Sequence, residues 1–139
     1  MKKKVLLLCT HNSCRSQMAE GIVNHFLGDR FQAYSAGTET TRVNPMAIRI
    51  LKEIGIDISG HYSKTIDEFA YDKFDHVITL CGSANEECPL YIGGVRRVHM
   101  GFGDPSRTIG TEEDILADFR RVRDEIMDKL LIYLRQFDQ

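Results

Sequence analysis

A cysteine and an arginine near the N-terminus have a spacing that suits chemistry on a tetrahedral anion. Cys9 ends the apolar run VLLLC, and Arg15 follows six residues later, where a helical pattern begins. A loop between a strand and a helix directs backbone N–H groups inward, and the helix N-terminus adds a partial positive charge. Arg15 can hold two oxygens of the anion in a bidentate fork. The same environment favours the thiolate of Cys9, a nucleophile for in-line attack on phosphorus or arsenic.

The residues between this cysteine and arginine are polar. We expect Asn12 to adopt a left-handed backbone conformation and to hydrogen-bond within the loop, and a serine hydroxyl to donate to the thiolate or the anion. No glycine separates Cys9 from Arg15, which excludes a nucleotide-binding glycine loop. The alternative is a small buried thiol and a surface charge, but a strand-to-helix turn favours function. The predicted oxyanion-binding loop comprises Thr10, His11, Asn12, Ser13, Cys14, Arg15 and Ser16.

Strands alternate with helices along the rest of the chain. Hydrophobic patterning predicts strands at residues 4–9, 31–37, 74–81 and 95–100, helices at 16–29, 44–56 and 111–137, and a short helical segment at 64–70. This order predicts a single α/β domain over residues 1–139, with a four-stranded parallel sheet flanked by helices on both faces. Ligands bind at the carboxyl ends of such strands, so we expect Cys9, Cys81 and the GFGDP loop at one edge.

Composition excludes several classes of partner. The 139 residues are 42% hydrophobic and 27% charged, as in a globular domain, and the net charge of −2 offers no basic surface for nucleic acid or membrane. The first apolar run is too short to cross a bilayer, and the polar residues after it argue against a signal peptide. We expect a cytoplasmic protein.

The chain has four cysteines, at positions 9, 14, 81 and 88. In a reducing compartment, thiols near polar loops are catalytic, redox-active or metal-binding rather than structural bridges. The spacings match no zinc pattern and the histidines form no ligand cluster, so we expect neither a metal nor a cofactor. For Cys14 we favour a structural or protective role over an essential one.

Several motifs together carry a resemblance to a known family. CTHNSCRSQMAEG resembles the anion loop of the low-molecular-weight tyrosine phosphatase fold, and especially of its thioredoxin-coupled arsenate reductases. The similarity continues in order through YSAG, NPMAI, GIDISGH, VITLCG, CP, GFGDP and FRRVRDEI. It implies that Cys9 is the nucleophile, Arg15 the anion clamp and Asp104 the general acid. From its position before Pro105 alone, Asp104 would be equally consistent with a turn residue.

The distal cysteines distinguish reduction from hydrolysis. Reducing arsenate requires a second thiol: Cys81 can attack a Cys9–arsenic adduct and release arsenite, and Cys88 can then take over the disulfide. The resemblance implies this relay of three cysteines, with thioredoxin as the final partner. No aromatic residue follows Asp104 and Pro105, whereas the phosphatases of this fold tend to carry aromatics there. We therefore predict a monomeric arsenate reductase with weak phosphatase activity, for which phosphate and sulfate are competing oxyanions.

Two alternatives remain open from the sequence. The first is a phosphatase for phosphotyrosine or small phosphate esters, which would use the same loop and acid. The second is a non-enzymatic redox switch, although no motif marks a surface for its partner.

Two positions depart from the pattern of the resembling reductases. His11 stands where many of them have glycine, and we expect its side chain to be exposed, with altered access to the loop as the alternative. Some of them bind potassium through residues equivalent to Asn12, Glu20, Ser35 and an acidic residue at position 64, which here is Lys64. We hypothesise that the Lys64 ammonium replaces the ion and pairs with Glu20, the alternative being an ordinary surface lysine.

Overall fold

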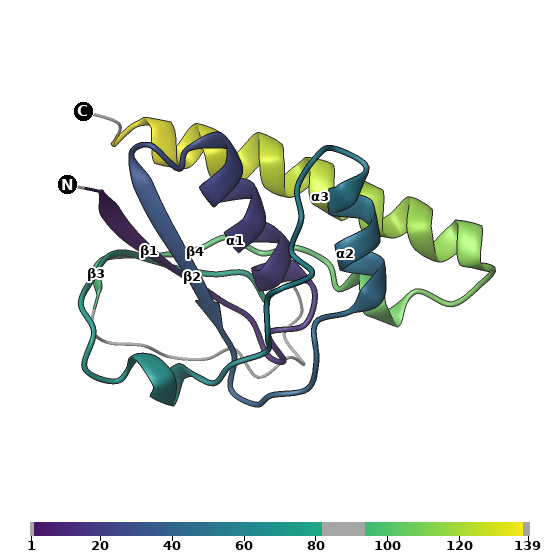
Figure 1. Cartoon of the computed structure of the whole chain (residues 1–139), viewed down its shortest axis with the longest axis horizontal. Coiled ribbons are helices and arrows are strands. Elements are labelled where there is room, and N and C mark those ends of the chain that lie inside the picture. The colour runs from purple at the N-terminus through teal and green to yellow at the C-terminus, as the bar shows by residue number, and fades with distance from the viewer. Residues whose placement is uncertain (1, 82–93, 138–139) are drawn as a thin grey trace.

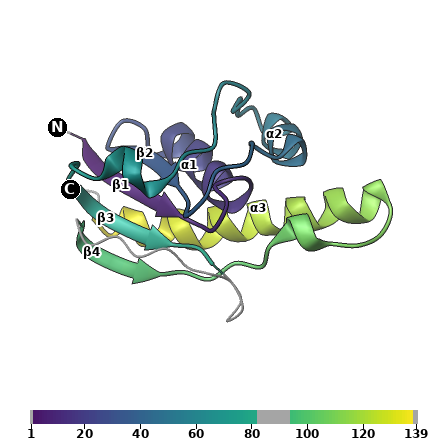
Figure 2. The ribbon, with the colours of Figure 1, turned by 90° about the horizontal axis from the view of Figure 1, so that it is seen from below.

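Four parallel strands form one sheet at the centre of the protein (Figure 1). The computed structural model describes residues 2–81 and 94–137. The sheet has the order β2-β1-β3-β4, and its strands are β1 (Lys3–Leu8), β2 (Phe31–Ala36), β3 (Phe74–Thr79) and β4 (Gly94–His99). All neighbouring strands pair in parallel, so their arrows point to the same edge (Figure 2). The predicted parallel sheet is confirmed.

The second and third α-helices begin at the residues that the sequence marks as caps. The α-helices are α1 (Arg15–Phe26), α2 (Pro45–Lys52) and α3 (Glu112–Arg135), and the 3-10 helices are η1 (Ile66–Phe69) and η2 (Pro105–Arg107). The side chain of Asn44 accepts a hydrogen bond from the Met46 amide, with Pro45 in the first turn of α2. Thr111 and Asp114 form the reciprocal capping box at the start of α3. Within residues 2–81 and 94–137, no helix is long and apolar enough to cross a membrane.

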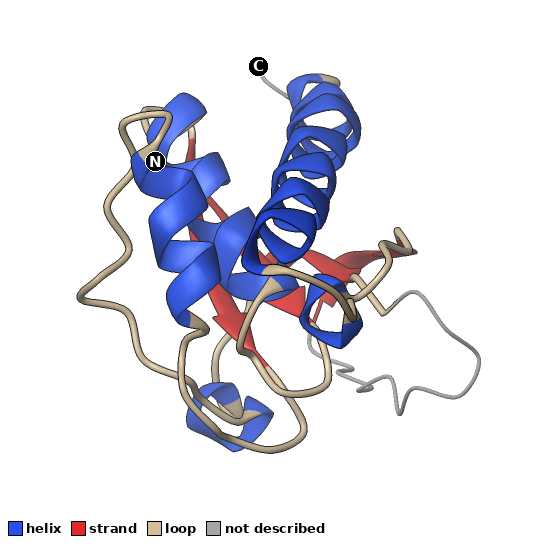
Figure 3. Cartoon of the chain, turned by 90° about the vertical axis from the view of Figure 1, so that its right-hand side faces the viewer, coloured by secondary structure: helices blue, strands red, loops and turns tan. Residues whose placement is uncertain are grey.

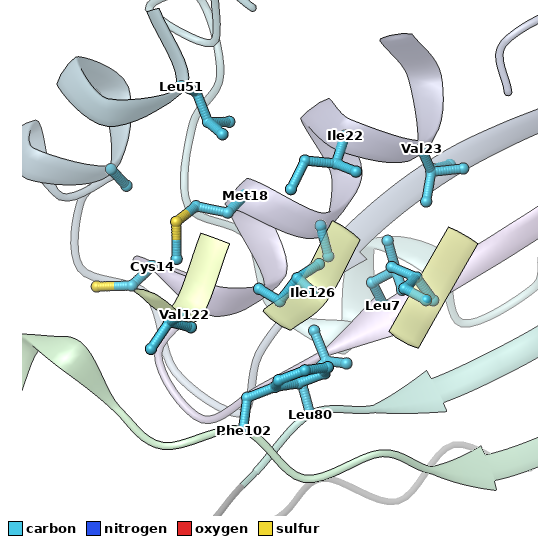
Figure 4. Packing of buried hydrophobic residues seen from close by; sticks show 14 of the residues in the cluster. Leu7, Cys14, Met18, Ile22, Val23, Leu51, Leu80, Phe102, Val122 and Ile126 are labelled. Carbon is cyan, nitrogen blue, oxygen red and sulfur yellow. The ribbon is translucent and has the colours of Figure 1, made fainter. Parts of the chain in front are cut away.

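The two faces of the sheet are covered differently (Figure 3). Val5 and Leu7 of β1 lie in the larger core, together with apolar residues of α1, α2 and α3 (Figure 4). Leu6 and Leu8 point to the other face, where Phe69 of η1 packs with them. Helices therefore lie on both faces, as predicted, but in the described part of the chain all three α-helices pack on one face. The predicted helix at 64–70 is the short 3-10 helix η1.

A charged cluster ties α2 to α3. Arg123 is 9% exposed and donates to the Ile50 carbonyl and to Glu53, each at 2.9 Å. Arg120 binds both oxygens of the same carboxylate at 2.7–3.1 Å. The hydrogen bonds from Arg120, with a smaller contribution from those of Arg123, lower the pKa of Glu53 to about 2 against the opposing effect of burial.

Replacing this carboxylate tests the contribution of the cluster to stability. We expect Glu53→Gln to lower the free energy of unfolding by about 1 kcal/mol at neutral pH, because the amide removes the carboxylate that binds Arg120 and one of the two that bind Arg123. Since the pKa of Glu53 is lowered from 4.5 to about 2, this stability is present above that ordinary value and is lost as the pH falls towards 2. Urea unfolding of both proteins at several pH values measures the difference.

The control is Glu112→Gln, which removes an exposed pair with Arg49. We expect it to cost less than about 0.5 kcal/mol. Equal losses in both variants, or a loss for Glu53→Gln that does not change with pH, would contradict the assignment.

Candidate active site

The predicted oxyanion loop connects β1 to α1. Cys9 follows β1, is 2% exposed, and has its Sγ atom 2.9 Å from the Oγ atom of Ser16 in the first turn of α1. The side-chain amide of Asn12 donates to the same Oγ atom at 2.7 Å. Because Ser16 accepts that bond, its own hydrogen can be directed at the Cys9 sulfur. The expected serine donor is therefore Ser16.

Asn12 has the left-handed backbone conformation that the sequence predicts, with a φ of +51°. Its side chain is fully buried, and both its nitrogen and its oxygen form hydrogen bonds. The Oδ1 atom accepts hydrogen bonds from the Gln17 side chain and from the Lys64 amide, each at 2.8 Å. An asparagine with these bonds holds a turn for which glycine would otherwise be suited.

The loop packs tightly against the end of β2. Gly37 follows β2, and a Cβ atom at this position would lie 2.6 Å from the Thr10 carbonyl oxygen and 2.8 Å from the Asn12 nitrogen. Its amide donates to the Lys64 carbonyl and its carbonyl accepts from Ile66. A glycine is required here because backbone from three segments meets without room for a side chain.

Arg15 and Asp104 meet above the loop. Arg15 is 3% exposed, and its Nη1 atom donates to the Phe102 carbonyl at 3.1 Å. Its Nη2 atom lies 3.6 Å from Oδ2 of Asp104. The other oxygen of Asp104 accepts from the amide and the hydroxyl of Ser106. The fold thus brings the predicted acid Asp104 to the predicted nucleophile loop and its clamp Arg15, although Asp104 is far from them in the sequence.

These residues enclose a small open pocket of about 210 Å³, mouth included. It is lined by Cys9, His11, Ser13, Cys14, Arg15, Asp104 and Ser106. Ser106 was not anticipated from the sequence, although its position two residues after Asp104 at a turn is a signal for such a contact. Gln17, which fixes the Asn12 side chain, was also missed because a glutamine within a helix is unremarkable. Among the described residues, no group of His, Cys, Asp and Glu side chains could hold a metal ion.

Cys14 lines the pocket but is suited to a thiol rather than a thiolate. Burial raises the pKa of Cys14 to about 12, and the negative charge of Asp104 acts in the same direction. A protonated sulfur is a weak nucleophile, so this environment agrees with the structural or protective role that we favour.

Cys81 lies one strand away from the nucleophile, at the same edge of the sheet. Leu8 pairs with Thr79, and the Leu80 amide donates to the Leu8 carbonyl, so Cys9 and Cys81 follow the ends of adjacent strands. Cys81 is 3% exposed and does not line the pocket. The predicted site residue Cys88 lies outside the described residues.

The residues of the hypothesised cation site lie together beneath the loop. Lys64 is 7% exposed, and its ammonium donates to the Tyr62 carbonyl at 3.0 Å and lies 3.8 Å from Glu20. Ser35 donates to the same carboxylate oxygen at 2.5 Å. The Lys64 backbone amide reaches the Asn12 side chain. Lys64 is therefore not a surface lysine.

An anion in this pocket would meet a thiol at its base and a carboxyl group beside it. This combination on an α/β fold is typical of the proteins in which a cysteine attacks an oxyanion. The chain belongs to the low molecular weight phosphotyrosine protein phosphatase family, whose sequence model matches residues 4–139.

Several proteins similar to this chain are named arsenate reductases. The arsenate reductase of Halalkalibacterium halodurans is 54% identical over 125 residues, which are 90% of each chain. That of Bacillus subtilis is 50% identical over 131 residues, or 94% of each. The solved structure of an arsenate reductase in the reduced state is 36% identical, with a TM-score of 0.79 over 99% of both chains.

A substitution at the contact between β2 and the loop tests the architecture of the site. We expect Gly37→Ala to lower the free energy of unfolding by about 2 kcal/mol, because the methyl group must displace backbone rather than a flexible side chain. Phosphate should also stabilise the variant less than the wild type, since the anion-binding amides move. Thermal unfolding with and without phosphate measures both effects.

Gly60→Ala is the matched control, because a methyl group added at this position would have no neighbouring atom within 4 Å. We expect its stability and its response to phosphate to equal those of the wild type. A Gly37→Ala protein that behaves like this control would contradict the requirement for glycine at the end of β2.

Proposed function

We propose that this protein reduces arsenate to arsenite through Cys9, and that the reaction is completed by a relay through Cys81 and Cys88 to thioredoxin. The observation that carries the proposal is the position of Cys9 and Cys81 after adjacent parallel strands, which supplies a second thiol beside an oxyanion pocket. The extensive identity to proteins named arsenate reductase supports the same reaction.

In the first step, the oxyanion is held by the loop amides and by Arg15. The thiolate of Cys9 attacks arsenic, a sulfur–arsenic bond forms, and one arsenic–oxygen bond breaks. Asp104 donates a proton to the departing oxygen, which leaves as water. The anion competes with Asp104 for Arg15, whose Nη2 atom lies 3.6 Å from Oδ2 of this carboxyl group. Arsenic remains in its +5 state after this step.

Reduction occurs in the second step. The Cys81 thiolate attacks the Cys9 sulfur, and the electron pair of the sulfur–arsenic bond passes to arsenic, which leaves as arsenite. The two thiols lose two electrons in total and become a disulfide. Cys88 then attacks the sulfur of Cys81, which releases Cys9 and leaves a Cys81–Cys88 disulfide for reduction by thioredoxin.

A phosphatase activity is supported by the shared loop and acid, and we propose it as a weak side reaction. The position after Pro105 is Ser106, so no aromatic side chain is present there to bind a phenyl ring, which supports a free oxyanion as the substrate. A non-enzymatic switch would leave the contact between Arg15 and Asp104 without a role.

We further propose that the Lys64 ammonium supplies the positive charge beneath the loop. It lies near Glu20 and is oriented by the Tyr62 carbonyl, and its ring contact with Tyr62 at 4.7 Å excludes water from one side. A monovalent cation would compete for the same oxygens, so Lys64 makes such an ion unnecessary.

Cysteine variants test the relay. With thioredoxin, thioredoxin reductase and NADPH, we expect arsenate-dependent NADPH consumption to fall by at least about 100-fold in both Cys81→Ser and Cys88→Ser. In single turnover, Cys88→Ser should still release one equivalent of arsenite and accumulate a Cys9–Cys81 disulfide, whereas Cys81→Ser should release none. Arsenite analysis and mass spectrometry of the trapped disulfide provide the two measurements.

Hydrolysis of p-nitrophenyl phosphate is the control, since it needs Cys9 and Asp104 but neither distal thiol. We expect both variants to retain it. A wild-type protein that hydrolyses the ester rapidly but consumes no NADPH with arsenate would be a phosphatase, and the proposed reduction would be wrong.

Ion replacement tests the role of Lys64. We expect turnover and melting temperature of the wild type to be the same in potassium and sodium chloride at equal ionic strength. Lys64→Asp places a second carboxylate near Glu20, so potassium should raise the melting temperature of this variant by about 3 °C or more relative to sodium. Faster wild-type turnover in potassium would contradict the proposal.

A further inference from the structure

We propose that His11 determines which substrates this site accepts: its side chain restricts the mouth of the pocket to free inorganic oxyanions and disfavours their organic esters. This inference rests on the proposed function, because it concerns the selectivity of the same pocket.

The residues that line the pocket differ in depth. Cys9, Cys14 and Arg15 are at most 4% exposed and form its base. His11 also lines the pocket, and its side chain is 44% exposed, so this residue lies at the mouth. Ser13 and Ser106 also line the pocket and are at least partly exposed, so they lie at the mouth as well. Of the described residues that line the entrance, His11 is therefore the one with a ring, and its side chain is the largest.

A contact with a carboxylate orients the His11 ring. Its Nε2 atom lies 2.9 Å from the Oε1 atom of Glu39, which belongs to the segment that follows β2. This segment is itself fixed to the loop, because the amides of Thr38 and Glu39 both donate to the Thr10 carbonyl. The carbonyl of His11 accepts a hydrogen bond from the Ser63 hydroxyl at 2.9 Å. The ring and the backbone of His11 thus both have bonding partners, and the ring forms one wall of the entrance.

In-line attack explains why a wall at this place selects between substrates. The thiolate of Cys9 approaches from the base, so the departing oxygen must point away from it, towards Asp104 and the mouth. For free arsenate or phosphate this oxygen carries only hydrogen. For an ester it carries an organic group, which must pass beside His11. The ring therefore penalises the ester in binding and in the transition state, and the inorganic ion is unaffected by this clash.

The test compares two reactions in each protein. We measure kcat/KM for p-nitrophenyl phosphate hydrolysis and for thioredoxin-coupled arsenate reduction, and we take their ratio. His11→Ala should raise the ratio of ester to arsenate by about tenfold or more, because the wall is removed. His11→Gln keeps most of the bulk and should change the ratio by less than about threefold. A ratio that stays at the wild-type value in His11→Ala would overturn the proposal.

Inhibition of the wild-type enzyme gives a second measurement that needs no variant. Methylphosphonate and phenylphosphonate carry the same anionic group, and only the second has a ring that must extend through the mouth. We expect phenylphosphonate to inhibit arsenate reduction at least about tenfold more weakly than methylphosphonate. Equal inhibition constants would overturn the proposal, whereas absence of arsenate turnover in the wild type would instead refute the proposed function.

Discussion

The hydrogen bonds of the Asn12 side chain are the interaction on which the site depends. A left-handed conformation is unfavourable for a residue with a side chain, and the buried amide offsets this cost by binding Ser16, Gln17 and the Lys64 backbone at once. One of these bonds orients the Ser16 hydroxyl towards Cys9. The conformation of the loop and the hydrogen-bonding partner of the Cys9 sulfur therefore both depend on the same amide.

Parallel topology provides the second constraint, because it collects the chemistry at one edge. Cys9, Gly37 and Cys81 each follow the carboxyl end of a strand, and the loop with Asp104 follows the fourth. No local interaction brings these segments together; the sheet register does so. Cys9, Cys81 and Asp104, to which we assign the proposed chemistry, consequently lie in one region of a small protein.

Sequence reasoning was most accurate where a local physical cause decides the outcome. Asn44 and Pro45 define the start of α2, and Thr111 with Asp114 defines that of α3, because caps satisfy backbone groups of their own turn. It was less accurate at residues 64–70, where Lys64 and Gly37 bond across segments and only a 3-10 helix forms. The sequence also did not predict which face of the sheet each α-helix covers. An amphipathic pattern shows which side of a helix is buried, but not the element against which that side packs.

The sequence by itself determined the class of the fold and the polar loop between a buried strand and a helix, because hydrophobic patterning and residue type are local properties. Only the tertiary structure decided which distant groups act on that loop. The burial of Lys64 beside Glu20, the contact of Arg15 with Phe102 and Asp104, and the His11–Glu39 pair at the mouth all join segments separated by long stretches of chain. Such contacts depend on sheet register and packing, for which residue types and spacing carry no signal.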